Sequence, residues 1–319
     1  MKIGLVLSVY NNVSLDEALR RAADAGYEAV ELGVEHHGGQ LDLDELLLGN
    51  NAGKLRKQIA DYGLIISALG NHAEGQLVLG PYHSDTDVVY AGTPAEKLRY
   101  GVDRVKKTAQ LAHELEVPIV TGFCGCEDYS RWFPWPDENA WDKTAPVFVE
   151  RWSDLLDTFA KYGVKFAHEC HPRQFAYNTE TAELTVDLLK GRPEWGFNLD
   201  PANLLLAGVD PVVFIQRLGD RILHVHAKDG ELVAHNAARS GLLAHGAWDR
   251  RDRGFRFRIP GWGDVRWKAV LTELRLVGYD YVLAVEHEDP TMSREDGVEK
   301  AIDFLKPLLI QKPFEGRWW

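Results

Sequence analysis

Short apolar runs alternate along the chain with longer segments in which apolar residues recur at helical spacing. The short runs predict strands at Ile3–Ser8, Ala29–Leu32, Leu64–Leu69, Pro118–Phe123, Val164–Glu169, Gly196–Leu199, Ile222–His226 and Tyr281–Glu286. The longer segments predict helices at Ser14–Ala25, Ala95–Leu115, Phe148–Tyr162, Thr181–Lys190, Pro211–Leu218, Trp267–Val277 and Gly297–Leu308, with a less regular candidate at Asp44–Tyr62 that breaks near Gly49–Gly53. This alternation predicts parallel strands, because each helix returns the chain to the same end of the sheet.

Glycine marks several junctions between a predicted helix and the next strand. Gly26, Gly63, Gly163 and Gly278 each follow a helix directly, where a left-handed residue stops it. Eight strand–helix units close into a (β/α)₈ barrel. We therefore predict an α/β protein with one TIM-barrel domain over residues 1–319 and a C-terminal tail over about 309–319. An open doubly wound sheet is the alternative, but no G-x-G-x-x-G pattern follows the first strand.

Two connections are too long to be simple turns. Gly125–Pro146 follows the fourth predicted strand, Gly230–Asp264 follows the seventh, and both are rich in tryptophan. Loops of this length in a compact domain are usually functional or disordered. Both should emerge at the C-terminal face of the barrel, where such enzymes keep their active sites, so we expect them to cover the pocket.

Composition narrows the choice of partners. The chain of 319 residues carries a formal net charge of −12, which opposes binding to a phosphate backbone, so we expect no nucleic-acid partner. No apolar run is long enough to cross a bilayer. The three cysteines (Cys124, Cys126 and Cys170) cannot all pair within the chain, and no secretory signal is evident. We therefore expect free thiols and a cytoplasmic protein.

Acids and histidines stand where four consecutive predicted strands run out. Glu169, Asp200, His226 and Glu286 occupy these ends of strands five to eight. In a barrel the four ends lie side by side around one rim. Any single strand-end acid is more often solvated or salt-bridged than a ligand, but four in succession favour a shared site. Three carboxylates and an imidazole suit Mn²⁺, Mg²⁺ or Co²⁺.

The seventh strand offers two histidines on one face, because strand side chains alternate with a period of two. His226 lies nearer the rim than His224 and is the predicted ligand. His224 is then a core histidine or a partner of the ligands.

These residues resemble the xylose-isomerase-like barrels, a superfamily of sugar isomerases and epimerases that also holds tagatose and psicose 3-epimerases, inosose dehydratases and the endonuclease IV branch. The resemblance rests on His168-Glu169, Asp200, His224-x-His226-x-Lys228-Asp229 and Glu286, and it spans nearly the whole chain. It implies one divalent ion, with Mn²⁺ expected and Mg²⁺ or Co²⁺ as alternatives, held by Glu169, Asp200, His226 and Glu286. It also implies that the two glutamates act as acid and base.

One position departs from that pattern. The epimerases and endonucleases carry a histidine three residues after the strand-six aspartate, where this chain has Asn203. An amide can hydrogen-bond a substrate hydroxyl, but it is a poor metal ligand and does not transfer protons near neutral pH. This difference weakens two hypotheses, that the protein is a multi-metal nuclease and that it is a simple ketohexose epimerase.

Further residues are candidates for contacts with the substrate. They lie just beyond predicted strands or in the two long connections, and comprise His72, His171, Arg173, Asn203, Lys228, Trp132 and Trp262. Lys228 either neutralises the acidic ligands or forms a salt bridge at the rim. The tryptophans either stack on sugar or brace the loops. The arginines between residues 250 and 258 bind an anionic group or pair with the protein's own acids.

The function expected is that of a metal-dependent carbohydrate isomerase or epimerase. It would abstract a proton beside a carbonyl and pass through a metal-bound enediolate, with Glu169 and Glu286 as the proton-transfer pair. A lyase, dehydratase or deglycosidase acting on a keto-sugar or keto-glycoside shares the opening step. An endonuclease IV-like nuclease and a non-catalytic sugar-binding barrel are two further hypotheses. We then expect a small carbohydrate as the partner and no association with a membrane. The aromatic C-terminus (Trp318 and Trp319) favours a homo-oligomer.

Overall fold

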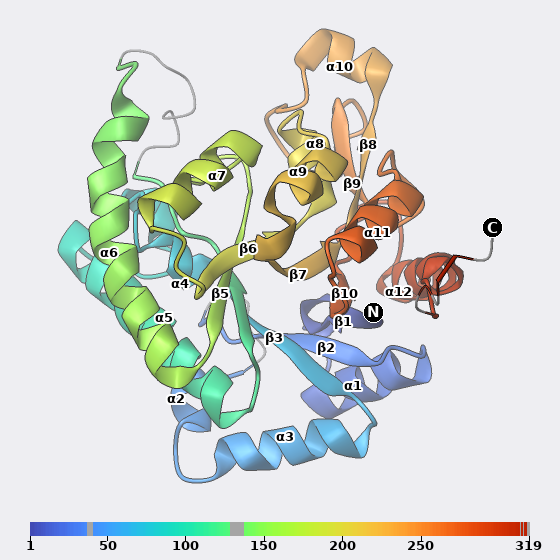
Figure 1. Ribbon diagram of the computed structural model, residues 1–319, viewed down its shortest axis with the longest axis horizontal. Coiled ribbons are helices and arrows are strands. Elements are labelled where there is room, and N and C mark those ends of the chain that lie inside the picture. Colours follow the sequence, from blue (N-terminus) through green and yellow to red (C-terminus); the bar gives the residue numbers. More distant parts are fainter. Residues whose placement is uncertain (37–40, 128–136, 313, 315, 318–319) are drawn as a thin grey trace.

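A closed parallel barrel forms the centre of the molecule. The computed structural model describes residues 1–36, 41–127, 137–312, 314 and 316–317. Within them, eight strands close in the order β1–β10–β7–β6–β5–β4–β3–β2, with helices around the outside (Figure 1). The barrel strands are β1 (Lys2–Val6), β2 (Ala29–Gly33), β3 (Ile65–Asn71), β4 (Ile119–Gly122), β5 (Lys165–Glu169), β6 (Trp195–Leu199), β7 (Ile222–Ala227) and β10 (Val282–Val285). The predicted (β/α)₈ barrel is confirmed, and each predicted strand overlaps one of these.

Helices fill the connections between successive strands. They are α1 (Leu15–Asp24), α2 (Leu43–Leu46), α3 (Asn51–Asp61), α4 (Ala73–Gln76), α5 (Pro94–Glu114), α6 (Ala140–Tyr162), α7 (Thr179–Leu188), α8 (Pro201–Leu206), α9 (Pro211–Leu218), α11 (Trp267–Leu276) and, after the last strand, α12 (Arg294–Leu305). The predicted break near Gly49–Gly53 separates α2 from α3. Local signals set the ends: Thr93 and Glu96 form a capping box at α5, and Gly163 ends α6 with φ +67°.

The connection after β4 is shorter than predicted, because α6 begins at Ala140 and contains Pro146. The sequence pattern predicted a start at Phe148. Tertiary contacts explain the extra turns: the Trp141 ring stacks on Phe175 with centroids 4.4 Å apart, and its indole N–H donates to the Phe175 carbonyl at 2.9 Å. The predicted cover of the site by this connection, including Trp132, lies outside the described residues.

The connection after β7 is long, as predicted, and it contains secondary structure of its own. It contains β8 (Asp229–Leu232), α10 (Ala234–Ser240) and β9 (Phe255–Arg258), and β8 pairs with β9 in a separate antiparallel sheet. Figure 1 shows α10, β8 and β9 standing beyond the barrel on the side opposite α3. Asp229 ties this insert to the barrel, because its carboxylate accepts hydrogen bonds from the backbone N–H of Val265 (2.9 Å) and the indole of Trp267 (2.9 Å).

The barrel interior changes from apolar to polar along the strands. At one end, small and apolar side chains fill it, among them Ala68, Ile119 and Ala167. Nearer the C-terminal ends of the strands, the same inward positions carry acids, amides and histidines. The interior therefore closes one end of the barrel and leaves the other end for chemistry, as in other barrels of this architecture.

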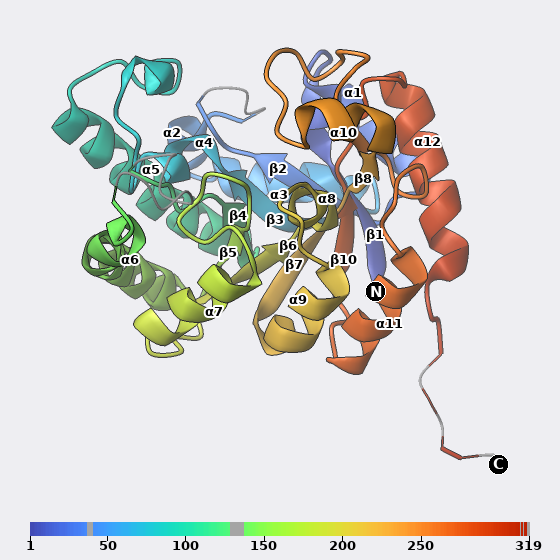
Figure 2. The ribbon, with the colours of Figure 1, turned by 90° about the horizontal axis from the view of Figure 1, so that it is seen from above.

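Two further expectations concern the surface and the thiols. No helix in the described part of the chain is both long and apolar enough to span a membrane. The three cysteines are buried as thiols. The chain beyond α12 runs away from the barrel (Figure 2), and Ile310 and Phe314 are 44% and 64% exposed there.

Candidate functional site

Four side chains from the C-terminal ends of neighbouring strands meet inside the barrel mouth. Glu169 ends β5, Asp200 follows β6, His226 lies in β7 and Glu286 follows β10. One ligand atom of each lies within 4.8 Å of the other three. Nδ1 of His226 is 2.9 Å from a Glu169 oxygen and 3.2 Å from a Glu286 oxygen. The structure thus brings the four predicted ligands to one point, and their role as ligands stays a prediction.

Asp200 is oriented by the short helix that follows it. It is the N-cap of α8, and its Oδ1 accepts the backbone N–H groups of Ala202 (2.8 Å) and Asn203 (3.1 Å). Pro201 suits the first helical position, since it has no N–H there to leave unsatisfied. One carboxylate oxygen is therefore used by the backbone, and Oδ2 faces the other acids.

Lys228 is buried among these acids rather than exposed at the rim. Its ammonium is 2.9 Å from Asp200, 2.7 Å from Glu286 and 3.1 Å from Glu288, and its residue is 2% exposed. It also lies 4.7 Å from the centroid of the Phe257 ring. Of the two roles that the sequence allowed for Lys228, the contacts favour neutralisation of the acidic cluster.

Three of the four predicted ligands are carboxylates, and one lysine, Lys228, lies among them. Burial raises the pKa of Asp200 to about 7 against the opposing effect of Lys228, and Glu169 and Glu286 add to the rise. The Nδ1 atom of His226 is buried and makes no well-formed hydrogen bond, although oxygens of Glu169 and Glu286 lie 2.9 and 3.2 Å from it. Three carboxylates that converge on this imidazole nitrogen fit a divalent cation with oxygen and nitrogen ligands.

Two asparagines hold the carboxylates in place. The side-chain amide of Asn203 donates to Glu169 at 2.7 Å and to Asp200 at 2.8 Å, and the amide of Asn198 donates to the other Glu169 oxygen at 3.1 Å. Asn203 therefore contacts two candidate ligands directly. An amide at this position satisfies both acids without adding a fifth ligand.

His72 lies beside Glu169, on the pocket side as predicted. Its Nε2 is 3.4 Å from a Glu169 oxygen, its Nδ1 is 3.4 Å from Glu35, and its ring meets Phe123 edge-on. Burial lowers the pKa of His72, but the adjacent carboxylates of Glu169 and Glu35 outweigh it and raise the pKa to about 10. His72 thus lies between two acids.

A cavity of about 420 Å³ opens onto these groups. Three aromatic side chains, Phe123, Trp248 and Phe257, form part of its wall. Trp248 comes from the insert after β7. The centroid of its ring lies 4.8 Å from the centroid of the Phe257 ring and 4.0 Å from the guanidinium carbon of Arg253. The insert thus covers part of the pocket, as predicted for this connection.

The remaining predicted contacts divide into two groups. His171 lines the cavity, and burial lowers its pKa. Arg173 is exposed, and Trp262 is half exposed with the guanidinium of Arg258 over its ring; neither is among the described residues that line the cavity. His168 points away from the site and packs on Trp195, with Nε2 2.8 Å from the Ala176 carbonyl oxygen.

Three of the five arginines between residues 250 and 258 pair with the protein's own acids, which was one of the two predicted roles of this cluster. Arg258 contacts Glu231 and Asp289, both at 2.7 Å, and Arg250 contacts Asp252 at 2.7 Å. These pairs stabilise the insert and its contact with the loop after β10.

Several residues of the pocket were not identified from the sequence. They include Glu31, Glu35 and Phe257. A signal for Glu31 was available, because an acid inside the apolar run Ala29–Leu32 has to face the barrel interior or a partner. The position of Trp248 had no such signal, since it depends on how the insert folds.

Most of the chain matches one known protein family. The family described as "Xylose isomerase-like TIM barrel" matches residues 19–308. The chain belongs to this family. The matched range includes all four strand ends that carry Glu169, Asp200, His226 and Glu286.

Curated relatives share sequence with most or about half of this chain. The protein YfiH of Bacillus subtilis (strain 168) is 28% identical over 98% of this chain and 100% of its own length. The inosose dehydratase of Clostridium tetani (strain Massachusetts / E88) is 28% identical over 50% of this chain and 55% of its own length.

Solved structures agree with the fold. The IolI protein with a bound zinc atom superposes with a TM-score of 0.66 at 19% identity, covering 97% of this chain and 98% of its own. A D-tagatose 3-epimerase-like protein gives a TM-score of 0.64 at 18% identity, covering 97% and 98%. At these identities the likeness concerns the fold.

Proposed function

We propose that the protein is a divalent-metal-dependent isomerase or epimerase that moves a proton beside the carbonyl of an uncharged keto-sugar or related cyclic polyol. The observation that carries the proposal is the placement of Glu169 and Glu286. Their carboxylates come from β5 and from the end of β10, and both reach Nδ1 of His226, at 2.9 and 3.2 Å. Two carboxylates that meet at one point from different strands could serve one substrate carbon as base and acid.

The lining of the cavity favours a neutral substrate. Glu31, Glu35, Glu169, Glu286 and Glu288 line it, and Lys228 is the one lysine or arginine among the described lining residues. The three carboxylates around Lys228 already neutralise its charge. A phosphate or carboxylate on the substrate would meet net negative charge, whereas hydroxyl groups can donate to the acids and apolar sugar faces can pack on the aromatic wall.

Glu169, Asp200, His226 and Glu286 would hold the ion. A bound divalent cation supplies Lewis acidity, which polarises a carbonyl oxygen and lowers the cost of negative charge on it. Mn²⁺ is our proposal for the ion, and zinc in the similar IolI structure supports a divalent metal in this fold.

Glu169 and Glu286 are ionised before the reaction, as the abstraction of a proton requires. Burial alone would raise the pKa of Glu286, but Lys228 and His226 outweigh it and hold the pKa at about 2, so Glu286 starts as a carboxylate. The pKa of Glu169 is also well below its usual value, because His226 and His72 outweigh burial. Inversion requires the second carboxylate to carry a proton when it acts, so one of the two glutamates must take up a proton from solvent before turnover.

Solvent exchange tests the proposal. The parent protein, loaded with Mn²⁺ in D₂O, should introduce deuterium at the carbon beside the carbonyl of at least one neutral keto-sugar or inosose. Removal of the metal with a chelator should stop the exchange, and Mn²⁺ should restore it. A panel of neutral and phosphorylated substrates without any metal-dependent exchange would refute proton transfer as the function.

A second candidate is a lyase or dehydratase, and one structural observation favours it. A second cavity of about 620 Å³ adjoins the first, and the two share Ser8, Glu286 and Glu288. It is polar, with Asn11 and Arg294 in its wall, and gives room for a leaving group or second sugar ring. The similarity to an inosose dehydratase adds support. Mass spectrometry separates the two reactions: elimination removes water or an aglycone, whereas exchange adds only deuterium.

A further inference from the structure

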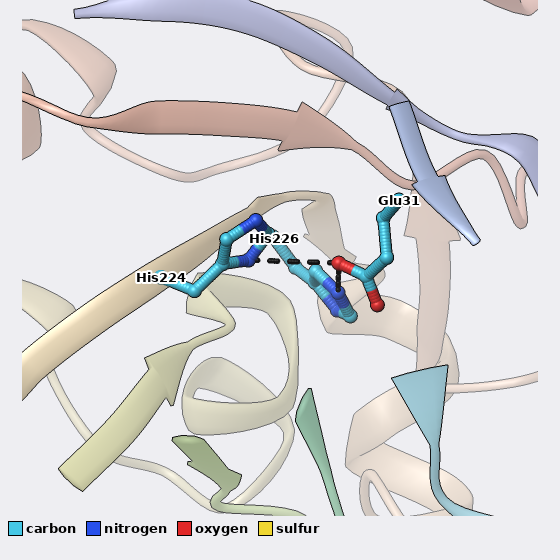
Figure 3. A group of neighbouring side chains, drawn as sticks. All are labelled: Glu31, His224 and His226. Atoms are coloured by element: carbon cyan, nitrogen blue, oxygen red, sulfur yellow. Dashed lines mark hydrogen bonds and ion pairs between the residues drawn. The ribbon is translucent and has the colours of Figure 1, made fainter. Parts of the chain in front are cut away.

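The carboxylate of Glu31 contacts the ring nitrogen of His226 that faces away from Glu169 and Glu286. Glu31 of β2 is buried, at 1% exposure, and its Oε2 is 3.0 Å from Nε2 of His226 in β7. β1 and β10 separate these two strands in the barrel order. Figure 3 shows the Glu31 carboxylate against the His226 ring, with His224 beside it. Glu31 therefore reaches across the barrel interior to this histidine.

The two nitrogens of His226 face different surroundings. Nε2 faces Glu31, whereas Nδ1 faces Glu169 and Glu286. A neutral imidazole carries one N–H, and a carboxylate only accepts hydrogen bonds. With the hydrogen on Nε2 and shared with Glu31, the lone pair of Nδ1 is directed at the predicted ligands.

Glu31 is itself held in place. The Thr121 hydroxyl of β4 donates to its Oε1 at 2.6 Å. The Glu31 carboxylate is thus fixed at one oxygen and presents the other to His226.

A second ion between Glu31, His224 and His226 is the competing interpretation of the same group, because their ligand atoms also lie within 4.8 Å of one another. The hydrogen bonds argue against it. The Asn198 amide donates to Glu169, so its oxygen faces Nδ1 of His224 at 3.2 Å. That nitrogen must then carry a hydrogen, which removes it as a ligand.

We propose that Glu31 is a positioning residue for the metal centre, holding the Nε2–H of His226 so that Nδ1 binds the ion. This proposal rests on the proposed function, since it requires a divalent ion at the four ligands. Carboxylates that hold the second nitrogen of a ligand histidine fix the ring and increase its basicity, and their loss typically costs 10–100-fold in metal affinity or activity.

Metal binding without substrate tests the proposal. The variants are Glu31→Ala, Glu31→Gln and Thr121→Val, and the control is Ser67→Ala, which removes a buried hydroxyl from neighbouring β3 that donates to the Val30 carbonyl. Mn²⁺ affinity is measured by calorimetry, and the Co²⁺ visible absorption spectrum reports ligand geometry. Melting of the metal-free proteins reports folding separately.

Glu31→Ala should weaken Mn²⁺ binding by about 10–100-fold and change the Co²⁺ spectrum. Glu31→Gln should recover part of the affinity, because its amide oxygen still accepts from Nε2–H. Thr121→Val should cause a smaller loss, and Ser67→Ala should match the parent protein.

The proposal is overturned if folded Glu31→Gln and Thr121→Val both bind Mn²⁺ as the parent does, with the parent's Co²⁺ spectrum; these two variants decide the matter even if Glu31→Ala does not fold. Failure of the proposed function has a different signature. In that case, the folded parent binds neither ion at millimolar concentration, and both proposals fall together.

Discussion

Replacing Lys228 with methionine tests whether the acidic cluster needs a cation. Methionine keeps much of the apolar stem and removes the ammonium that lies 2.7 Å from Glu286 and 2.9 Å from Asp200. Breaking a buried ion pair by removing one partner costs about 3–5 kcal/mol, because the other charges remain buried. The unfolding entropy is about 2.1 cal/mol/K per residue, or about 0.7 kcal/mol/K for 319 residues, so the metal-free variant should melt about 4–7 °C lower.

Divalent metal should reverse much of this loss. Lys228 and the ion neutralise the same carboxylates, so Mn²⁺ should raise the melting temperature of Lys228→Met more than that of the parent. Binding to the native state stabilises it by RT ln(1 + [L]/Kd), which turns the measured shifts into affinities. The assay is thermal melting with a chelator and across a Mn²⁺ titration.

The pH dependence has a definite sign. The pKa of Asp200 is raised from 3.8 to about 7 in the folded protein, so its contribution to stability is present at low pH and is lost as pH rises through that range. Lys228 opposes the increase in the pKa of Asp200. Its removal should therefore destabilise the metal-free protein more at pH 8 than at pH 6.

Lys106→Met is the matched control. Its ammonium forms a surface ion pair with Asp154 at 2.6 Å, and exposed pairs contribute about 0–1 kcal/mol. If Lys228→Met melts with the parent and gains no more from Mn²⁺ than Lys106→Met does, the carboxylates do not depend on a cation and the argument for the metal centre fails.

Three further outcomes are expected. Glu169→Gln and Glu286→Gln should each reduce solvent-deuterium exchange at saturating Mn²⁺ by at least about 100-fold, the usual contribution of a general base; exchange at the parent rate in either metal-loaded variant would remove that glutamate from proton transfer. Trp248→Ala should raise KM several-fold while the melting temperature changes little, since this 46%-exposed ring lines the cavity; an unchanged KM with a lower melting temperature would make it a structural brace of the insert. Deleting residues 316–319 should reduce the mass seen by light scattering if the tail holds a homo-oligomer, and an unchanged mass would exclude the tail from the interface.

Much of the architecture was predictable because each signal was local. Short apolar runs located the eight barrel strands, and glycines 26, 63, 163 and 278, all with positive φ, ended helices where predicted. The strand-end acids were also visible, since an ionisable group at the end of an apolar strand has to lie at a rim. The start of α6 was predicted wrongly, because the stacking of Trp141 on Phe175 outweighs the signal of Pro146.

The sequence by itself determined the order of strands and helices, the parallel barrel and the four residues that meet at its mouth. These follow from short-range periodicity and from the geometry of closing eight equal units. Only the tertiary structure decided the partners of those four residues. Lys228 lies within the acidic cluster, Asn203 bridges Glu169 and Asp200, and Glu31 contacts His226 from three strands away. Such contacts join side chains that are distant in sequence, so they depend on side-chain rotamers and burial inside the closed barrel, which no local pattern encodes.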